Sequence, residues 1–548
     1  MFTQIKPKKQ LVILLVLAII FFFIYSFLVY DNPLSRFTWP DETANYFFIS
    51  NFVSESDFRF AEPLNQIAAN LIHPRSFNVF EHDLVPGSFL GLLLIYGLVA
   101  KLVGLTLIKY LTPLLAVIAG LFFYKILLKI FSPKIAFIST LLFYINPAWW
   151  YYAGFSMLPN IAFISFLIIG LFFYLDIDKH KEQRNVLRVI FAAFFIGLAF
   201  IIRTNEFLWI LGILVLILLV YWRKIKWYYP LVFITVIFLV FVPIFYYNQQ
   251  TYGSYLSFGY LRLEQGNDLV SQIPTEFKPA EKSALYNFTK FLVLPFGYNQ
   301  ENFLAVIYQY YIQLFWWLFI PAILGLLILL KKYNKQSKAV YFICFLAVSA
   351  YLIIYYGSWI FADKMTLELN QLGISYVRYF LPIYIFSLPL AALFFYSLAN
   401  SLKNKKLKII LSALLIGSCI YFSVNLIYFS PNDGLIKIKE NINDYNQINQ
   451  KISQLTESKA VIISRRSDKI FFPQRKVISR LQLQDTQYWH QLLAQGIPLY
   501  YYSYEGKEFM TQLTSDLTGF DILMTDMVPV HGNESLYKVI YYAEDEEY

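Results

Sequence analysis

The sequence predicts an α-helical membrane protein with many spanning helices and a small α/β domain near its C-terminal end. Of the 548 residues, 58% are hydrophobic and only 15% are charged, whereas a soluble domain carries about 25% charged residues. Apolar segments of membrane-spanning length recur as far as about residue 430, and short apolar strands then alternate with helical stretches. We therefore expect about 11–13 membrane segments in residues 1–430 and an extracytoplasmic α/β domain in residues 431–548.

The first apolar segment has the features of a membrane anchor. Lys6, Lys8 and Lys9 precede an apolar run over residues 11–30, which is about the length that a spanning helix needs. No small-x-small cleavage site follows, so we expect a retained helix with a cytoplasmic N-terminus. The later apolar segments cover about 86–104, 107–124, 134–152, 156–175, 189–203, 205–222, 228–247, 311–330, 339–356, 379–399 and 408–429.

The distribution of charge predicts which loops face the cytoplasm. Three short loops, 176–188, 331–338 and 403–408, are strongly basic, whereas the stretch 31–85 holds eight acidic residues against three arginines. Residues 1–430 carry 33 basic and 19 acidic residues, a net charge of +14, and the rest carry 12 and 16, a net charge of −4. Basic loops next to spanning helices belong in the cytoplasm, so the basic excess needs no nucleic-acid partner, and we expect none.

The predicted topology contains one conflict. The loops 31–85, 248–310 and 357–378 and everything after Ser430 should face outward. If every apolar segment after Pro86 crossed the membrane, the basic loop 176–188 would lie on the wrong side. At least one segment before Leu175 must therefore enter without crossing, or two segments must form one broken helix.

Several function classes lack support in the sequence. The two cysteines, Cys344 and Cys419, both lie inside apolar runs and offer neither a disulfide framework nor a cysteine metal site. The histidines fit no zinc spacing, and there is no glycine-rich nucleotide motif. ATP-driven transport therefore loses its usual signature.

The strongest local signal is an acidic pair about ten residues after the first helix. Asp41 and Glu42 lie in the string FTWPDETANYFFISNF, which predicts a helix along the membrane interface. A carboxylate at this position can deprotonate an acceptor or bind a divalent cation. The alternative is that Asp41 only caps the helix that starts at Glu42, with Pro40 beginning the turn.

A second polar group follows before the next apolar segment. It contains Arg75 and the triplet Glu81-His82-Asp83. Together with Asp41, the side chains of His82 and Asp83 are candidate ligands for a divalent cation such as Mg, Mn or Zn. The alternative is an ordinary solvated loop.

Two arginines at the ends of apolar segments are candidate phosphate ligands. Arg203 lies in AFIIRTNEFLW, between two segments that predict a tight hairpin, and Arg378 lies in ISYVRYFLPIY. Arginine binds phosphate oxygens through two parallel hydrogen bonds. Each arginine could equally extend to lipid headgroups.

Six features in order resemble the GT-C superfamily of polytopic glycosyltransferases. The resemblance is to the branch of protein O-mannosyltransferases, lipid A aminoarabinose transferase and transferases with the RgtA/B/C/D-like domain. It covers about residues 1–430. The features are Asp41-Glu42, a proline-led helix from Pro86 to Gly104, Asn146-Pro147, Arg203-x-Asn205, NQQTYGSYLSFGY ending at Tyr260, and VRYFLPIY containing Arg378 and Tyr379.

This resemblance implies a function and a set of site residues. The enzyme would transfer a sugar, a hexose such as mannose or a pentose, from a polyprenyl-phosphate donor to a lipid, glycan or protein acceptor by inversion. Asp41 and Glu42 would be catalytic. The residues expected to bind substrate are Arg378, Tyr379, Arg203, Asn205, Tyr260 and Arg75.

Two further interpretations remain open at this point. A transporter or flippase of a lipid-linked glycan would share the helices and the arginines but would need no carboxylate pair at the outer surface. A non-catalytic relative would use the C-terminal domain to bind a partner. In each case we expect a multi-pass protein of the plasma (inner) membrane that contacts membrane lipids.

Overall fold

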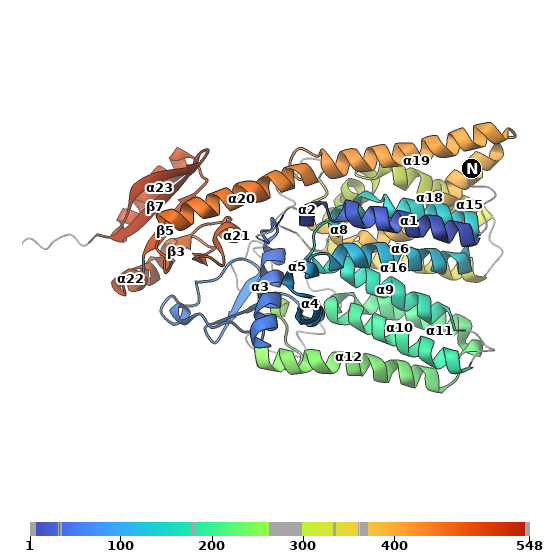
Figure 1. Ribbon diagram of the computed structural model, residues 1–548, viewed down its shortest axis with the longest axis horizontal. Helices are drawn as coiled ribbons and strands as arrows, with labels where there is room; N and C mark the ends of the chain where they lie inside the picture. The colour runs from blue at the N-terminus through green and yellow to red at the C-terminus, as the bar shows by residue number, and fades with distance from the viewer. Residues whose placement is uncertain are drawn as a thin grey trace, which may run out of the picture.

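The computed structural model consists of a helical bundle with a small domain at one end (Figure 1). It describes residues 7–30, 32, 35–177, 182–261, 299–331, 336–359, 361 and 371–542. Parts of the predicted loops 176–188, 248–310, 331–338 and 357–378 therefore lie outside the described residues, as does the end of the chain after residue 542.

Eight helices of the described chain are long and apolar enough to cross a membrane. These helices match the hydrophobic thickness of a bilayer, and a helix pairs most of its backbone groups internally. The protein is thus an integral membrane protein. These helices are α1 (Pro7–Tyr25), α6 (Leu111–Ile130), α10 (Glu182–Ile202), α11 (Phe207–Tyr221, which reaches 18 residues with the preceding turn from Thr204), α12 (Tyr228–Tyr252), α16 (Gln336–Gly357), α18 (Leu381–Ser401) and α19 (Lys405–Tyr428).

Three further passages through the bundle are shorter or broken. Asn146 and Pro147 divide one of them into α7 (Pro133–Tyr144) and α8 (Pro147–Ala153), and the Asn146 side chain accepts a hydrogen bond from the Trp149 amide at 3.0 Å. Another is α9, whose bounds are Pro159–Leu175. The third is bent by 97° between α14 with its π-helical extension and α15. By length and composition, the described chain has eight spanning helices, or nine if the bent pair forms one span, and the helices of the other two passages are shorter. The bounds of the bent passage are α14 (Gln300–Ile307), the π-helical turn η8 (Tyr308–Gln313) and α15 (Trp316–Lys331).

One apolar segment, helix α4, is shorter than a bilayer core and lies at the end of the bundle, which is the kind of non-crossing segment that the predicted topology requires. Helix α4 (Leu90–Val103) has 14 residues, or about 21 Å of helix, which is shorter than the roughly 30 Å of a bilayer core. Figure 1 shows it nearly end-on at the domain end of the bundle, whereas α6 and α9 run along the bundle. If α4 is not counted as a spanning helix, the C-terminal ends of α6 and α9 lie at the same end of the bundle. An ion pair between Lys129 and Asp176 joins those two ends directly.

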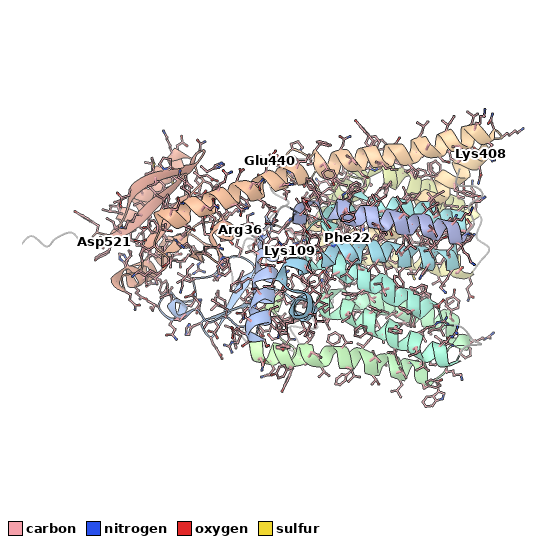
Figure 2. All side chains as sticks on the ribbon, in the orientation of Figure 1. Phe22, Arg36, Lys109, Lys408, Glu440 and Asp521 are labelled. Carbon is pink, nitrogen blue, oxygen red and sulfur yellow. The ribbon has the colours of Figure 1, made fainter. Side chains whose placement is uncertain are left out.

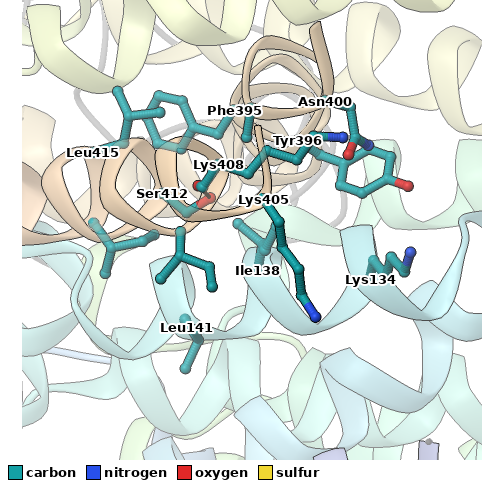
Figure 3. A pocket seen from close by; sticks show the side chains of 13 residues that line it. Lys134, Ile138, Leu141, Phe395, Tyr396, Asn400, Lys405, Lys408, Ser412 and Leu415 are labelled. Carbon is teal, nitrogen blue, oxygen red and sulfur yellow. Dashed lines mark hydrogen bonds between the residues drawn. The ribbon is translucent and has the colours of Figure 1, made fainter. Parts of the chain in front are cut away.

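The bundle has a basic end and a domain end. Figure 2 shows Lys408 at one end and Asp521 of the C-terminal domain beyond the other. At the basic end Lys134 of α7 lies with Lys405 and Lys408 of α19 around a small cavity (Figure 3). Helix α1 begins at this same end (Figure 1). Clustered basic side chains next to spanning helices are typical of a cytoplasmic side.

The domain end carries the segments between the first and second long helices. Helix α3 (Pro40–Glu55) runs across the end of the bundle (Figure 1). A short hairpin of β1 (Phe77–Phe80) and β2 (Asp83–Pro86) follows, with Phe77 opposite Pro86 at its base. Helix α4 packs closely on α10, because a Cβ at Gly91 would lie 2.1 Å from the Ile201 carbonyl oxygen. Short helical turns complete this region: α2 (Phe27–Tyr30), η2 (Pro63–Gln66), α5 (Leu105–Ile108), η3 (Thr204–Glu206), η5 (Gly259–Leu261) and α17 (Ser375–Tyr379). The turn η4 (Trp222–Lys224) joins α11 to α12 at the opposite, basic end, where Tyr221 and Ile225 line a pocket with Lys129 and Asp176.

The C-terminal domain is a small α/β unit, as predicted. Its five strands have the order β4-β3-β5-β7-β6, with β3 parallel to β4 and β5 and the remaining pairs antiparallel. The predicted boundary after Ser430 falls between α19 and α20. The elements are α20 (Leu435–Leu455), β3 (Val461–Ile463), α21 (Asp468–Phe471), β4 (Lys476–Ile478), η10 (Leu483–Asp485), α22 (Thr486–Ala494), β5 (Leu499–Ser503), α23 (Lys507–Thr518), β6 (Ile522–His531) and β7 (Glu534–Tyr541).

The C-terminal domain and the first outer loop share one hydrophobic core. Ala68, Leu71 and Ile72 of the loop are buried in the same cluster as Val461 and Trp489 of the domain. The loop also forms a parallel bridge between His73 and Ile478 at the β4 edge of the sheet. Because apolar burial is the main favourable term in packing, the domain is fixed to the loop that leads to β1.

Candidate active site

Asp41 lies in the first turn of α3 and accepts two hydrogen bonds from distant parts of the chain. Arg378 Nη1 donates to Oδ2 at 2.9 Å and Ser76 Oγ donates to Oδ1 at 2.7 Å. The side chain is 22% exposed. The N-cap position belongs to Trp39, which makes no side-chain cap bond, so the alternative that Asp41 caps the helix is wrong.

Glu42 points away from its neighbour into the protein. The residue is 2% exposed, and its carboxylate accepts a hydrogen bond from the Met157 amide at 3.1 Å. Asn45, one turn further along α3, donates to the Met157 carbonyl oxygen at 2.8 Å. Burial raises the pKa of Glu42 to about 8, an effect that the Met157 hydrogen bond reduces and the Asp41 charge increases. Of the predicted catalytic pair, only Asp41 thus presents an open carboxylate, and Glu42 links α3 to the segment before α9.

Arg378 is buried beside Asp41 with part of its guanidinium unused. Its side chain is 3% exposed, and Nη2 donates to Ser375 Oγ at 3.2 Å. The guanidinium carbon lies 5.1 Å from the ring centre of Trp39 and 5.0 Å from that of Tyr379, which favours a cation. Nε has no hydrogen-bond partner among the described residues. A buried donor without a partner is rare in proteins, so this atom is available to a ligand.

Arg203 belongs to a second cluster that is closed on itself. Its Nη2 lies 3.0 Å from Glu206 Oε1 and donates to the Tyr356 hydroxyl at 2.7 Å. Asn205 Nδ2 donates to the same hydroxyl at 2.7 Å, and the hydroxyl donates to Glu206. The Arg203 guanidinium lies 4.7 Å from the centre of the Tyr379 ring, which stacks on Tyr356 at 4.5 Å. Tyr379 therefore contacts both arginines and joins the two clusters.

Tyr260 is held at the edge of the same region. Its backbone is fixed next to the β1–β2 hairpin, since Asn78 Nδ2 donates to the Gly259 carbonyl oxygen at 2.7 Å. Burial raises the pKa of the Tyr260 phenol, as do Tyr379 and Asp41, while the two buried arginines act in the opposite direction. The Tyr260 ring also lies against the ring of Phe89, directly before α4, with the two centroids 5.1 Å apart.

Arg75 is the predicted binding residue that the structure places elsewhere. Its Nε donates to Asp468 Oδ1 at 2.7 Å, and its backbone amide donates to Oδ2 at 2.9 Å. Arg75 thus contacts the C-terminal domain, although the next residue, Ser76, contacts Asp41.

The three predicted metal ligands are not brought together. His82 Nδ1 lies 2.9 Å from Asn70 Oδ1, and Asp83 forms an ion pair with Arg59 at 3.2 Å, both at the tip of the β1–β2 hairpin. Asp41 lies at the base of that hairpin. Within the described part of the chain, no group of three or more His, Cys, Asp or Glu side chains suits a metal ion. The arrangement of these residues does not fit the predicted cation site.

Three residues of the site were not predicted from the sequence. Glu206 lies three residues after Arg203 in the same string, and this i, i+3 spacing of opposite charges is a signal that could have identified it. Ser76 and Tyr356 carry no local signal. They are hydroxyl side chains whose partners, Asp41 and Arg203, are 35 and 153 residues distant in sequence.

Comparison with solved structures identifies the fold. ArnT from Cupriavidus metallidurans in the apo state matches 96% of this chain and 97% of its own with a TM-score of 0.54 and 10% identity. ArnT bound to undecaprenyl phosphate matches with a TM-score of 0.53, 10% identity and the same two shares. The archaeal oligosaccharyltransferase AglB from Archaeoglobus fulgidus, in complex with an inhibitory peptide and a dolichol-phosphate, has a TM-score of 0.51 and 14% identity over 89% of this chain and 69% of its own.

These matches confirm the predicted GT-C fold. The ArnT matches extend over nearly the full length of both chains, so the C-terminal domain, which lies outside the sequence resemblance, is included. No protein-family model matches the chain, and no curated protein matches it in sequence.

Proposed function

We propose that this protein is a membrane glycosyltransferase that moves a sugar from a polyprenyl-phosphate donor to an extracytoplasmic acceptor with inversion. The observation that carries the proposal is the Asp41–Arg378 pair, an open carboxylate against a buried arginine with an unused donor atom. The donor class is supported by ArnT and AglB, whose structures contain undecaprenyl phosphate and dolichol-phosphate.

Asp41 is placed to accept a proton. A carboxylate has about four lone-pair positions, and two of those on Asp41 are used by Ser76 and Arg378. Its 22% exposure leaves access for an acceptor hydroxyl or amine. An acceptor that enters there lies within hydrogen-bond reach of a carboxylate oxygen, which is the geometry that a general base requires.

Arg378 is placed to stabilise the leaving phosphate. In the proposed step the acceptor oxygen or nitrogen forms a bond to the anomeric carbon, and the bond from that carbon to the phosphate oxygen breaks. The lipid phosphate leaves with the electron pair, and the acceptor proton passes to Asp41. A fixed guanidinium near the developing negative charge lowers the barrier without reorganisation. Arg203 is a weaker candidate, because Glu206 and Tyr356 already accept hydrogen bonds from its Nε and Nη2.

The remaining features of the proposal concern the donor sugar, the acceptor and the location. The donor sugar is a hexose or a pentose, and the acceptor is a lipid, a glycan or a protein. The protein resides in the plasma (inner) membrane with the basic end in the cytoplasm and the C-terminal domain outside. The cluster of Lys134, Lys405 and Lys408 at the basic end supports this orientation.

A donor-turnover assay tests the proposal. Purified wild type, Asp41→Asn and the control Asp57→Asn receive a panel of polyprenyl-phosphate monosaccharides with and without EDTA. We expect wild type and the control, which alters another carboxylate of the same outer region, to turn over one donor and Asp41→Asn to lose that activity. Full transfer by a correctly folded Asp41→Asn protein would overturn the role of Asp41. Movement of lipid-linked sugar between leaflets without transfer would instead identify a flippase.

A further inference from the structure

The C-terminal domain contacts both chain segments that meet at Asp41. The contacts come from the short helix α21 and the residues just after it. Figure 2 shows Arg36 in the region where the domain meets the bundle. The first segment is residues 36–39, directly before α3, and the second is the stretch that ends at Ser76.

The first segment is held through Arg36 and Thr38. Arg36 Nη1 donates to the carbonyl oxygens of Ile470 at 2.8 Å and Phe472 at 3.0 Å, and its Nη2 donates to the side chain of Gln474. Lys469 Nζ donates to the Thr38 carbonyl oxygen. Asp41 follows Thr38 by three residues, so these contacts determine where α3 begins.

The second segment is held through Arg75. The Asp468 carboxylate is 1% exposed and accepts hydrogen bonds from both the side chain and the backbone amide of Arg75. A carboxylate that binds backbone and side chain of one residue restrains that residue in position and orientation. Ser76, the next residue, donates to Asp41 at 2.7 Å.

Ser76 needs this restraint because its backbone is strained. Its φ is +64°, a left-handed conformation that residues other than glycine rarely adopt. Gly87 donates to the Ser76 carbonyl oxygen at 3.1 Å, and a Cβ at Gly87 would lie 2.6 Å from that oxygen. The conformation therefore persists only with support from both sides, the hairpin base and the C-terminal domain.

We propose that the C-terminal domain positions the Asp41 carboxylate, with Asp468 acting through Arg75 and Ser76 and with Lys469 acting through Thr38. This inference rests on the proposed function, because it gives Asp41 its role in transfer. Asp468 touches neither substrate nor reacting atoms in this account. It is a positioning residue that sets the direction in which the open Asp41 oxygen points.

The chain offers a matched control for this proposal. Lys476 of β4 forms an ion pair with Glu62 of the same outer loop, whose side chain is 5% exposed. This pair joins the same two parts of the molecule and has a similarly buried carboxylate, but neither residue neighbours Ser76 or Asp41 in sequence. Asp468→Ala and Lys476→Gln therefore each break one ion pair between the domain and the loop. Only Asp468→Ala also removes the restraint on Ser76.

The first experiment compares the kinetics of full-length Asp468→Ala, Lys476→Gln, Ser76→Ala and the double variant Asp468→Ala/Ser76→Ala. We expect Asp468→Ala to lower kcat about tenfold or more with KM for the donor changed less than twofold, and Lys476→Gln to change both less than twofold. The double variant should be no slower than the slower single variant, because both changes remove the same restraint. Equal kcat losses in Asp468→Ala and Lys476→Gln, or additive losses in the double variant, would overturn the proposal.

The second experiment does not depend on activity. Hydrogen–deuterium exchange is measured on peptides that cover residues 36–42 and 74–78. We expect faster exchange in both peptides for Asp468→Ala than for Lys476→Gln, since the Arg75 amide loses its acceptor. If wild type turns over no donor but this difference appears, the proposed function fails and the positioning contact stands. Equal exchange in the two variants would refute positioning by Asp468 whatever the kinetics.

Discussion

The two buried arginine–carboxylate pairs of the site contact the same tyrosine ring but differ in what surrounds them. Arg378 pairs with Asp41, which is 22% exposed, and keeps Nε without a partner among the described residues. Arg203 pairs with Glu206, which is 3% exposed, and gives a further bond to Tyr356. A buried pair resists change, because breaking it leaves an uncompensated buried charge. The open pair can exchange partners with a ligand, whereas the closed pair maintains the structure.

The largest expected effect distinguishes the two carboxylates. Asp41→Asn should lower kcat by roughly 10²–10⁴-fold, the usual contribution of a general base, with little change in thermal stability. Glu206→Gln should instead lower Tm, because Arg203 then lies buried without a charge partner. Turnover and Tm of both variants in detergent check this pair of outcomes. If Glu206→Gln lost activity at unchanged Tm, the closed pair would also belong to the chemistry.

Changing the arginines sharpens the same comparison. Arg203→Gln should destabilise the protein by about 3–5 kcal/mol, because Glu206 keeps a buried charge. Arg378→Gln should cost less stability, since Asp41 retains contact with solvent, but should weaken donor binding by roughly tenfold or more. Thermal unfolding and donor affinity for both variants provide the measurement. Equal destabilisation by the two changes would show that Asp41 is not effectively solvated.

The pH dependence of stability tests the burial of Glu42, the neighbour of the open Asp41. Burial raises the pKa of Glu42 from 4.5 to about 8 in the folded protein. Between pH 4.5 and about pH 8, Glu42 is ionised in the unfolded chain but keeps its proton in the folded protein. The free energy of unfolding therefore decreases as pH rises through this range, and Glu42 causes no further decrease above about pH 8. We expect Tm of wild type to fall from pH 5 to pH 8 more steeply than Tm of Glu42→Gln. Parallel curves would contradict the buried state of Glu42.

The smallest expected effect concerns the hydroxyl that closes the second cluster. Tyr356→Phe removes the common partner of Arg203, Asn205 and Glu206. Leaving buried donors without that partner should cost about 1–3 kcal/mol, with donor affinity largely preserved. Thermal unfolding and a donor-binding titration of Tyr356→Phe and wild type provide the measurement. A loss of affinity with no loss of stability would place Tyr356 in direct contact with the donor.

Much of the fold could be predicted from the sequence because hydrophobicity is a local property. A run of about 20 apolar residues forms a helix across the bilayer whatever lies elsewhere in the chain. The strands predicted after Ser430 and the break at Asn146-Pro147 are present for similar local reasons. The segment that does not cross, α4, could not be identified in this way. Its sequence is as apolar as that of a spanning helix, and only its length and its packing on α10 exclude a crossing.

The site was predicted in its parts but not in its connections. Asp41, Arg378 and Tyr379 lie together, as the resemblance to a known family implied. Arg75 instead binds Asp468 of the C-terminal domain. His82 and Asp83 lie at the tip of the β1–β2 hairpin. The sequence by itself determined that this is a membrane protein with a carboxylate and arginines at the ends of its helices. The tertiary structure alone decided that Asp41 is open and Glu42 buried, that Ser76 supports Asp41, and that the C-terminal domain restrains both. Hydrogen bonds act over about 3 Å, so partners up to 438 residues apart in sequence meet only once the whole chain has packed.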